Sequence, residues 1–522
     1  MNPQLNYALL LPEIVLTIWG ILVMVIEPLL PQRSTQKGLG IFAFIGTLAA
    51  IAASLWQTTI PAGTGWFDMI RVDEFSIFFH VLICCISAVV ILASFEYLDS
   101  QQIRGGEYYA LILFGTVGMV LMSSAVELVL IFIALEISSI STYVLAGFRR
   151  RVATSAESSI KYFLLGSFAT AFFLYGVALM FGATGSTSIY TIASVLQSGQ
   201  TAGTGAPLLS HGLAYVAVAL MFVGIGFKVA SAPFHIWTPD VYEGAPAPVV
   251  ALMSTGPKAA AFAVLLRILF GAALNTGSGW FWLVWISAAL SMTLGNLGAL
   301  LQTNVKRMLA YSSIAHAGYL LVAFAARRDI GIAAAIFYAA SYAAMNVGAF
   351  AVVSHFARSG ERYVSITDYS GLGKRSPVLA ITLTIFMLSL IGIPATGGFF
   401  AKFYVFNAAL KSDLVWLTII GLVNSAVAAY YYLRLVVVMY MYEPQTGEGK
   451  LELRTAPGMA AALVITAALT IWLGVAPGRV LDYARRGADH LRPAAQQQSS
   501  FRSPASGYPQ DVRIPQHQAG DR

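Results

Sequence analysis

Long apolar runs follow one another along most of the chain. A window of about 20 residues, the length of helix that crosses a membrane, finds about fourteen such runs. They begin near Tyr7, Leu39, Ser76, Tyr108, Val126, Ser158, Leu213, Ala247, Phe281, Met308, Gly331, Val378, Leu414 and Met459. The runs are continuous and do not alternate between apolar and polar residues, which argues against a β-barrel. The pattern therefore predicts an all-α polytopic membrane protein with about fourteen transmembrane helices.

Two of these runs contain residues that interrupt a helix. The seventh breaks around Pro233, in FKVASAPFHIW, and the twelfth, in IGIPATGG, breaks at residues 391–398. A proline in a spanning helix frees a backbone carbonyl, which must then find another partner. The broken spans lie five spans apart, and because five is odd, a repeat of that length inverts its orientation. The breaks, rather than residue identity between the halves, predict two inverted five-helix repeats, as in many transporters.

The spans and breaks divide the chain into five parts. Residues 1–107 would hold helices 1–3, residues 108–270 the first repeat (helices 4–8) and residues 271–441 the second, inverted repeat (helices 9–13). Helix 14 would occupy residues 442–480. Residues 481–522 read as a polar tail, rich in Pro, Gln and Ser towards its end, that we expect to be disordered because it has little apolar surface to bury.

The composition changes how the charges are interpreted. The chain is 58% hydrophobic and 11% charged, whereas a soluble domain carries about 25% charged residues. Much of the net charge of +7 lies in the tail and in loops of one side, at residues 149–151, 306–307 and 374–375. Positive loops are cytoplasmic in membrane proteins. We therefore expect these loops inside, both termini on the periplasmic side, and no nucleic-acid partner.

The ionisable residues inside the spans are the candidate chemistry, because a charged side chain in hydrocarbon costs about 2.5–3.5 kcal/mol on insertion scales. Glu136 is the one acid near the middle of a span, and the membrane lysines are Lys161, Lys228, Lys258 and Lys402. A desolvated lysine can exchange its proton near neutral pH, and a neighbouring carboxylate changes how tightly the proton is held. A proton relay is the interpretation that this set favours.

Structural roles compete with the relay at each position. The buried charges could form fixed ion pairs, and Lys161, near the inner end of its span, could extend its ammonium group to the membrane surface. Arg267 and Arg434 hold their protons permanently. For them a structural ion pair, or a side chain extended to the membrane surface, is therefore favoured. His235, after the first break, and His316, in YSSIAHAGY, could relay protons at physiological pH, or each could be a satisfied structural group.

The sequence contains no pattern for a bound cofactor or metal. Cys84 and Cys85, the 2 cysteines of the chain, are adjacent inside a span and cannot ligate an iron–sulfur cluster. Gly224 and Gly226 do not follow a strand, so they are not a nucleotide fingerprint. We therefore expect no redox chemistry from this chain alone.

Three segments carry a close resemblance to a known family. FKVASAPFHIWTPDVYEGAPAPV, STGPKAAAFAVLLR and QTNVKRMLAYSSIAHAGYLLV resemble the N-type, antiporter-like membrane subunits of bacterial NADH–quinone oxidoreductase, respiratory complex I. The wording WTPDVYEGAP is closer to the N type than to its L and M sisters, and the match covers almost all spans. A lysine at position 402 also favours N over M, and the lack of a long lateral helix after span fourteen argues against L.

The resemblance implies a role for each membrane charge. It places the family's span-five glutamate on Glu136, its span-six lysine on Lys161, its span-seven and span-eight lysines on Lys228 and Lys258, and its span-twelve group on Lys402. It implies that NADH, FMN, iron–sulfur clusters and quinone are bound by other subunits. The implied partners are other membrane-arm subunits, lipids and protons, in a bacterial inner membrane.

Two further functions stay open at this stage. A subunit of a multi-subunit cation/proton antiporter or of a membrane-bound hydrogenase would share the spans and the buried charges. A purely structural scaffold is a weaker alternative, because it would not need several ionisable groups in the membrane. The proteins that purify with the chain would distinguish these functions.

Overall fold

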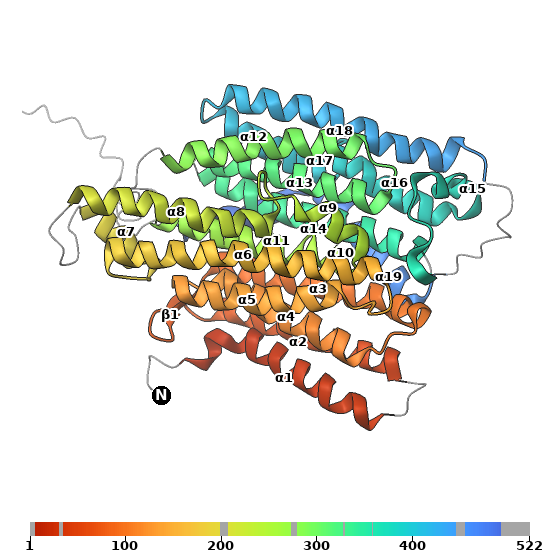
Figure 1. Cartoon of the computed structure of the whole chain (residues 1–522), viewed down its shortest axis with the longest axis horizontal. Helices are drawn as coiled ribbons and strands as arrows, with labels where there is room; N and C mark the ends of the chain where they lie inside the picture. The colour runs from red at the N-terminus through yellow and green to blue at the C-terminus, as the bar shows by residue number, and fades with distance from the viewer. Residues whose placement is uncertain are drawn as a thin grey trace, which may run out of the picture. The chain divides into compact units, whose positions relative to one another are not determined.

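The helices of the chain lie side by side with roughly parallel axes (Figure 1). A computed structural model describes residues 6–30, 35–198, 207–272, 279–326, 329–357, 359–444 and 455–491. Within these residues, thirteen helices are long and apolar enough to cross a membrane. One further crossing consists of two shorter helices on either side of a break. The expected all-α polytopic fold is confirmed.

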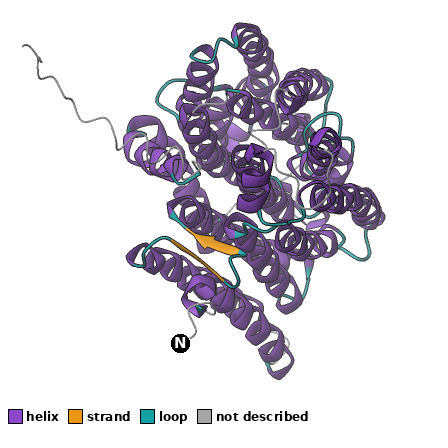
Figure 2. Ribbon diagram, turned by 90° about the vertical axis from the view of Figure 1, so that its left-hand side faces the viewer, coloured by secondary structure: helices purple, strands orange, loops and turns teal. Residues whose placement is uncertain are grey.

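The N-terminal part contains three spanning helices and a small hairpin. The elements are α1 (Leu11–Ile26), α2 (Thr35–Trp56), β1 (Gly63–Gly65), β2 (Ile70–Val72) and α3 (Glu74–Gln101). The antiparallel strands lie at one end of the helices (Figure 2). Helix α3 begins where Asp73 and Ser76 form a capping box, each side chain accepting a hydrogen bond from the backbone N–H of the other. Sequence periodicity did not reveal the hairpin.

The first repeat contains the first expected break and a second interruption. Its elements are α4 (Gly106–Ser124), α5 (Leu128–Ala146), α6 (Ala153–Thr184), α7 (Ile189–Ser198), α8 (Pro207–Val229), α9 (Trp237–Gly244), α10 (Ala247–Met253), α11 (Gly256–Leu266) and a π-helical segment (Arg267–Ala272). Span seven is α8 followed by α9, so the break around Pro233 is confirmed. Span eight is also divided, at Ser254 and Thr255, which we had not expected.

The second repeat contains the other expected break. Its elements are α12 (Gly279–Leu300), α13 (Val305–Ala325), α14 (Asp329–Ala357), α15 (Leu372–Arg375), α16 (Pro377–Ile391), α17 (Gly397–Leu410) and α18 (Val415–Met441). The break between α16 and α17 contains two residues with left-handed backbone, Gly392 (φ 95°) and Ala395 (φ 69°). Left-handed conformations do not continue a right-handed helix.

The packing of the two halves follows the repeat. Helix α4 packs against α5 and α11, and its counterpart α12 packs against α13 and α18. Both pairs meet closely at a glycine. A Cβ atom on Gly118 of α4 would lie 2.5 Å from the backbone nitrogen of Ser138, and one on Gly295 of α12 would lie 2.6 Å from that of Ala315. The equivalent contacts agree with two five-helix repeats.

The last helices correct one expectation. Helix α19 (Pro457–Val475) is span fourteen, and α20 (Gly478–Asp489) covers the start of the segment expected to be a disordered tail from residue 481. Leu481, Ala484 and Ala488 recur at helical spacing and are buried, and α20 packs against α3 and α14. The average composition of 481–522 hid this amphipathic stretch. Residues 492–522 lie outside the described part of the chain.

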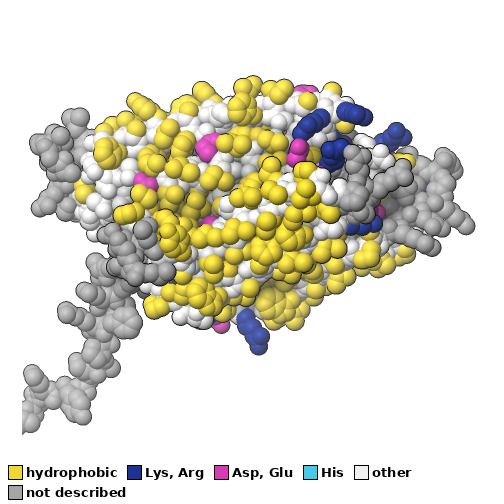
Figure 3. Space-filling model, turned by 90° about the horizontal axis from the view of Figure 1, so that it is seen from below, with side chains coloured by type: hydrophobic (Ala, Val, Ile, Leu, Met, Phe, Trp, Pro, Cys, Tyr) yellow, Lys and Arg dark blue, Asp and Glu magenta, His cyan; other side chains and the backbone are white. Residues whose placement is uncertain are grey.

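Apolar side chains cover the faces that would meet lipid. In Figure 3, hydrophobic side chains dominate the face seen from below, and Lys and Arg gather mainly towards one end. Exposed side chains of α1 such as Ile18, Ile21 and Val25 belong to this kind of surface. Lys228, Lys258 and Lys402 are instead buried in the interior, the arrangement expected when hydrocarbon is the solvent.

We predict that Gly118→Ala destabilises the protein by about 1–3 kcal/mol, because the added methyl group would overlap the backbone of α5 and force the helices apart. Gly38→Ala is the matched control, since a Cβ there meets nothing within 4 Å, and it should be neutral or stabilising by up to about 1 kcal/mol. The thermal unfolding midpoint of the solubilised protein measures both. Equal midpoints for the two variants would contradict the close packing of α4 and α5.

Candidate functional site

Lys228 and Glu136 lie near each other in the first repeat. Lys228 lies in the last turn of α8 and is 3% exposed. Its Nζ donates to Ser139 Oγ at 2.9 Å and to the Tyr162 hydroxyl at 3.5 Å. Glu136 precedes Ser139 by one helical turn on α5 and lies within electrostatic range of Lys228. One carboxylate oxygen of Glu136 is buried and has no hydrogen-bond partner among the described residues.

Side chains of the second repeat form hydrogen bonds with the backbone at the break after Lys228. Ala230 adopts a left-handed conformation (φ 59°) and ends α8. The backbone N–H of Ala232 donates to Ser291 Oγ at 2.7 Å, and Ser287 Oγ donates to the Ala232 carbonyl at 2.7 Å. Both serines belong to α12. Side chains of the second repeat thus satisfy backbone groups that the break of the first repeat frees.

Lys258 lies at the second interruption of the first repeat. It occupies the first turn of α11, directly after Gly256 and Pro257, and is 3% exposed. Its Nζ donates to the Ser313 carbonyl at 3.0 Å and to Ser313 Oγ at 2.5 Å, and the Tyr342 hydroxyl also donates to this Oγ at 2.7 Å. The Gly-Pro pair was a local signal for this interruption, because proline favours the first turn of a helix.

His316 lies between two lysines. It shares with Lys258 a small cavity of about 10 Å³, close to the volume that one water molecule needs. His316 Nδ1 is 2.7 Å from the Tyr338 hydroxyl, and Nε2 is 3.3 Å from the Tyr432 hydroxyl. Both Lys258 and Lys402 lie within electrostatic range of the ring. The two tyrosines were not among the residues selected from the sequence.

Lys402 binds the freed end of a half-helix. It lies in α17, after the second break, and its Nζ donates to the carbonyls of Leu390 at 3.0 Å and Ile391 at 2.8 Å. These carbonyls belong to the last residues of α16, where the helix dipole is negative. Nζ also donates to Ser425 Oγ at 2.8 Å and lies 4.8 Å from the ring centroid of Tyr319.

The remaining two candidates, Lys161 and His235, are not fully buried as Lys228, Lys258 and Lys402 are. Lys161 is half-exposed and forms ion pairs with Glu157 at 2.7 Å and Asp240 at 2.8 Å. This geometry agrees with the alternative that places its ammonium group at a helix end. His235 is half-buried in the first break, and its Nδ1 has no hydrogen-bond partner within the described ranges. The structure brings neither residue into a hydrogen bond with Lys228 or Lys258.

The two membrane arginines have structural partners. Arg267 forms an ion pair with Asp73 at 3.1 Å and donates from Nε to the Ser123 carbonyl at 2.8 Å. Arg434 donates to the carbonyls of Leu300 and Gln302 at the end of α12. Both arrangements agree with the structural roles expected from their permanent charge.

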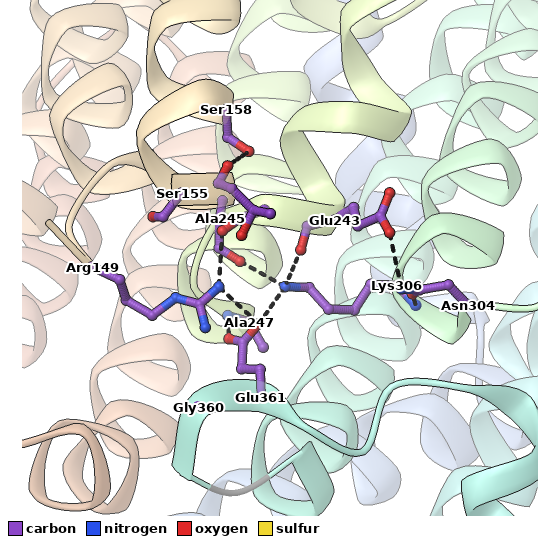
Figure 4. A network of polar contacts seen from close by, with 12 residues as sticks. Arg149, Ser155, Ser158, Glu243, Ala245, Ala247, Asn304, Lys306, Gly360 and Glu361 are labelled. Atoms are coloured by element: carbon purple, nitrogen blue, oxygen red, sulfur yellow. Dashed lines mark hydrogen bonds and ion pairs between the residues drawn. The ribbon is translucent and has the colours of Figure 1, made fainter. Parts of the chain in front are cut away.

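A second buried ion cluster, which we call the inner-end network, was missed by sequence reasoning (Figure 4). Glu361 accepts hydrogen bonds from Lys306 Nζ at 2.6 Å, from the Tyr97 hydroxyl at 2.9 Å and from the Ala247 N–H at 2.8 Å. Arg149 Nη2 lies 3.4 Å from the same carboxylate. Burial raises the pKa of Glu361, but the charges of Lys306 and Arg149 hold it below its usual range overall.

The network fixes the connection between spans seven and eight. Lys306 donates to the carbonyls of Glu243 at 2.8 Å and Ala245 at 2.7 Å, and Arg149 donates to that of Gly244 at 2.9 Å. Arg149 and Lys306 had been interpreted only as loop charges, yet both are buried. Their partner Glu361 lies far away in sequence, so no local pattern could have paired them.

Comparisons with known proteins agree with this geometry. Residues 125–428 match the family model described as NADH:quinone oxidoreductase/Mrp antiporter, TM. The chain is 64% identical to NADH-quinone oxidoreductase subunit N 2 of Koribacter versatilis over 94% of this chain and 98% of that protein. A chain of respiratory complex I from Thermus thermophilus with bound aureothin has 35% identity and a TM-score of 0.74, covering 90% of this chain and 98% of that one.

A third comparison concerns the fold alone. A chain of the Mrp complex from Dietzia sp. DQ12-45-1b is 20% identical with a TM-score of 0.77, covering 93% of this chain and 99% of that one. The fold and the buried lysines at helix breaks define an antiporter-like membrane subunit. At the identity and coverage found, the chain belongs to the NADH-quinone oxidoreductase subunit N family.

We predict that Glu361→Gln destabilises the protein by about 3–5 kcal/mol, because it leaves Lys306 and Arg149 buried without a counter-charge. Glu107→Gln is the control: Glu107 pairs with Arg150 on the surface, and its loss should cost at most about 1 kcal/mol. Thermal unfolding midpoints at neutral pH compare them. In the wild type, the stabilisation that the charged Glu361 carboxylate provides should be lost only as the pH falls through its lowered pKa. Similar midpoints for the two variants would refute the network's role.

Proposed function

We propose that this chain translocates protons in the membrane arm of a NADH–quinone oxidoreductase, coupled to quinone reduction in other subunits. The observation that carries the proposal is a set of ionisable residues inside the spans of both repeats, which we call the buried row. It consists of Lys228, Lys258, His316 and Lys402, which are buried, and of Glu136, which is half-buried. Each lysine of this row donates its hydrogen bonds to neutral oxygens of hydroxyls or carbonyls. Such a lysine can lose its proton without breaking a hydrogen bond to a carboxylate.

In this proposal Glu136 sets the proton affinity of Lys228. A charged carboxylate favours the protonated lysine, so a change in the charge or distance of Glu136 releases or recruits a proton. In the second step of the proposal, one water in the water-sized cavity that Lys258 and His316 both line carries protons between the two residues. His316, between the hydroxyls of Tyr338 and Tyr432, exchanges protons towards Lys402, which we place last and on the outward side.

The orientation and the partners form part of the same proposal. We propose a bacterial inner membrane, with the inner-end network on the cytoplasmic side and both termini on the periplasmic side. The positive-inside rule supports this orientation, because the basic loops meet at Glu361. We place the binding of NADH, FMN, iron–sulfur clusters and quinone in partner subunits, together with neighbouring antiporter-like and small membrane subunits. The chain alone should therefore have no NADH–quinone activity.

A cation/proton antiporter subunit is the second candidate. The observation that favours it is the fold shared with the Mrp complex chain, which is 20% identical. The 64% identity to a protein named for NADH-quinone oxidoreductase outweighs this likeness. Purification from native membranes with identification of the accompanying subunits separates the two, because only the first candidate brings NADH-oxidising partners.

We predict that Glu136→Gln and Lys228→Met each lower NADH-driven proton pumping in sealed proteoliposomes while the complex stays assembled. The two changes should not add, because a carboxylate that tunes a lysine has no effect once the lysine is gone. A double-mutant cycle should give a coupling energy of about 0.5–3 kcal/mol, the range for interacting residues. Glu136→Gln combined with Lys374→Met, on an exposed loop lysine, is the control cycle and should be additive. Additivity in both cycles would exclude the pairing.

A further inference from the structure

An elongated cavity of about 800 Å³ lies outside the buried row, on the side of the N-terminal helices. Its long walls come from α3, α14 and α19, and residues 55–62 and α20 also line it. On α3 the lining side chains recur at Ile77, Val81, Cys85 and Val89, which is one stripe of the helix. On α14 the wall consists of small side chains between Ala340 and Val347. The empty space therefore lies where the small alanine side chains of α14 face the larger apolar side chains of α3.

The cavity follows the helix axis rather than crossing it. Its lining on α3 extends from Glu74 to Val89, fifteen residue steps or about 22 Å at 1.5 Å per residue. One leaflet of a bilayer core is about 15 Å thick, half of about 30 Å. A slot of this length, with apolar walls and parallel to the spanning helices, has the shape of an extended acyl chain. Its volume lies within the range of about 300–1,000 Å³ typical of ligand sites.

The charged groups that line this slot gather at one end. Helix α20 lies across that end and contributes Tyr483, Arg486 and His490, and the start of α3 contributes Glu74. Arg486 Nε and Glu74 Oε2 are 3.5 Å apart, and both side chains are partly exposed. The guanidinium also lies 4.2 Å from the ring centroid of Tyr483. Arg486 and Glu74, loosely paired and partly exposed, thus lie side by side at the mouth.

We propose that this cavity binds a phospholipid with a zwitterionic headgroup, one that carries a phosphate and a primary ammonium group. An acyl chain fills the slot between α3, α14 and α19. The phosphate binds Arg486 and the ammonium binds Glu74, so the headgroup exchanges one loose ion pair for two. A polar mouth above a long apolar slot matches the polarity of a lipid, and Tyr483 and Trp472 are the aromatic types found at membrane interfaces. This site is independent of the proposed proton relay.

Photo-crosslinking tests the site in the assembled complex. The probe is phosphatidylethanolamine with a diazirine in the middle of one acyl chain, reconstituted with the purified complex in lipid nanodiscs. We expect crosslinks on peptides of α3 between Phe78 and Val89 and on α14 between Ala340 and Val347. Crosslinks confined to surface helices such as α6, or an isoprenoid quinone or a partner polypeptide found in the slot, would overturn the proposal.

Two sets of variants test the acyl-chain and headgroup contacts separately. Ala343→Leu with Ala344→Leu fills the slot and should abolish the α3 crosslinks, whereas Ala52→Leu, exposed on α2, should keep them. Arg486→Gln should lower the phosphatidylethanolamine retained after mild delipidation, and Arg485→Gln, its exposed neighbour outside the cavity, should not. Glu74→Gln should remove the preference for phosphatidylethanolamine over phosphatidylglycerol. Unchanged retention in Arg486→Gln would contradict the headgroup contacts even if the filled variant fails to fold.

Discussion

A helix interrupted inside hydrocarbon exposes backbone N–H and C=O groups that each cost several kcal/mol when unpaired. In this chain, the partners of those groups organise the interior. Ser287 and Ser291 of the second repeat satisfy the first break. At the second break, Lys402 donates hydrogen bonds to the carbonyls at the end of α16. The first break thus connects the two repeats, and the second gives a buried ammonium group its hydrogen-bond acceptors.

The buried cations fall into two groups that differ in their partners. Lys228, Lys258 and Lys402 are hydrogen-bonded to neutral oxygens, whereas Lys306 and Arg149 form ion pairs with the carboxylate of Glu361. Deprotonating a cation of the second group would leave a buried carboxylate unpaired, which is strongly unfavourable. In the first group the hydrogen-bond acceptors are neutral, so losing the proton breaks no direct ion pair. In the proposed function, lysine therefore serves proton transfer in the first group and rigid structure in the second.

The sequence predicted the parts of this structure that have a local cause. The spans and both breaks follow from apolar run length and from Pro233 and Pro394, and the buried lysines were found because charge in hydrocarbon is costly. The partners Tyr338, Tyr432 and Ser313 could not be selected, because a hydroxyl in a spanning helix is common and its use depends on which helices meet. The burial of Arg149 and Lys306 depends on Glu361, which is distant in sequence. Helix α20 was hidden by the polar average of its surroundings.

The most direct test of the account is the number of protons moved per NADH oxidised by the complex with Lys402→Arg in sealed proteoliposomes. Arginine keeps the charge and can bind the same carbonyls, but it does not release its proton. The account predicts a lower proton-to-electron ratio in an assembled complex, while Lys374→Arg on an exposed loop keeps the wild-type ratio. A wild-type ratio in Lys402→Arg would show that this lysine is structural and that protons leave by another route.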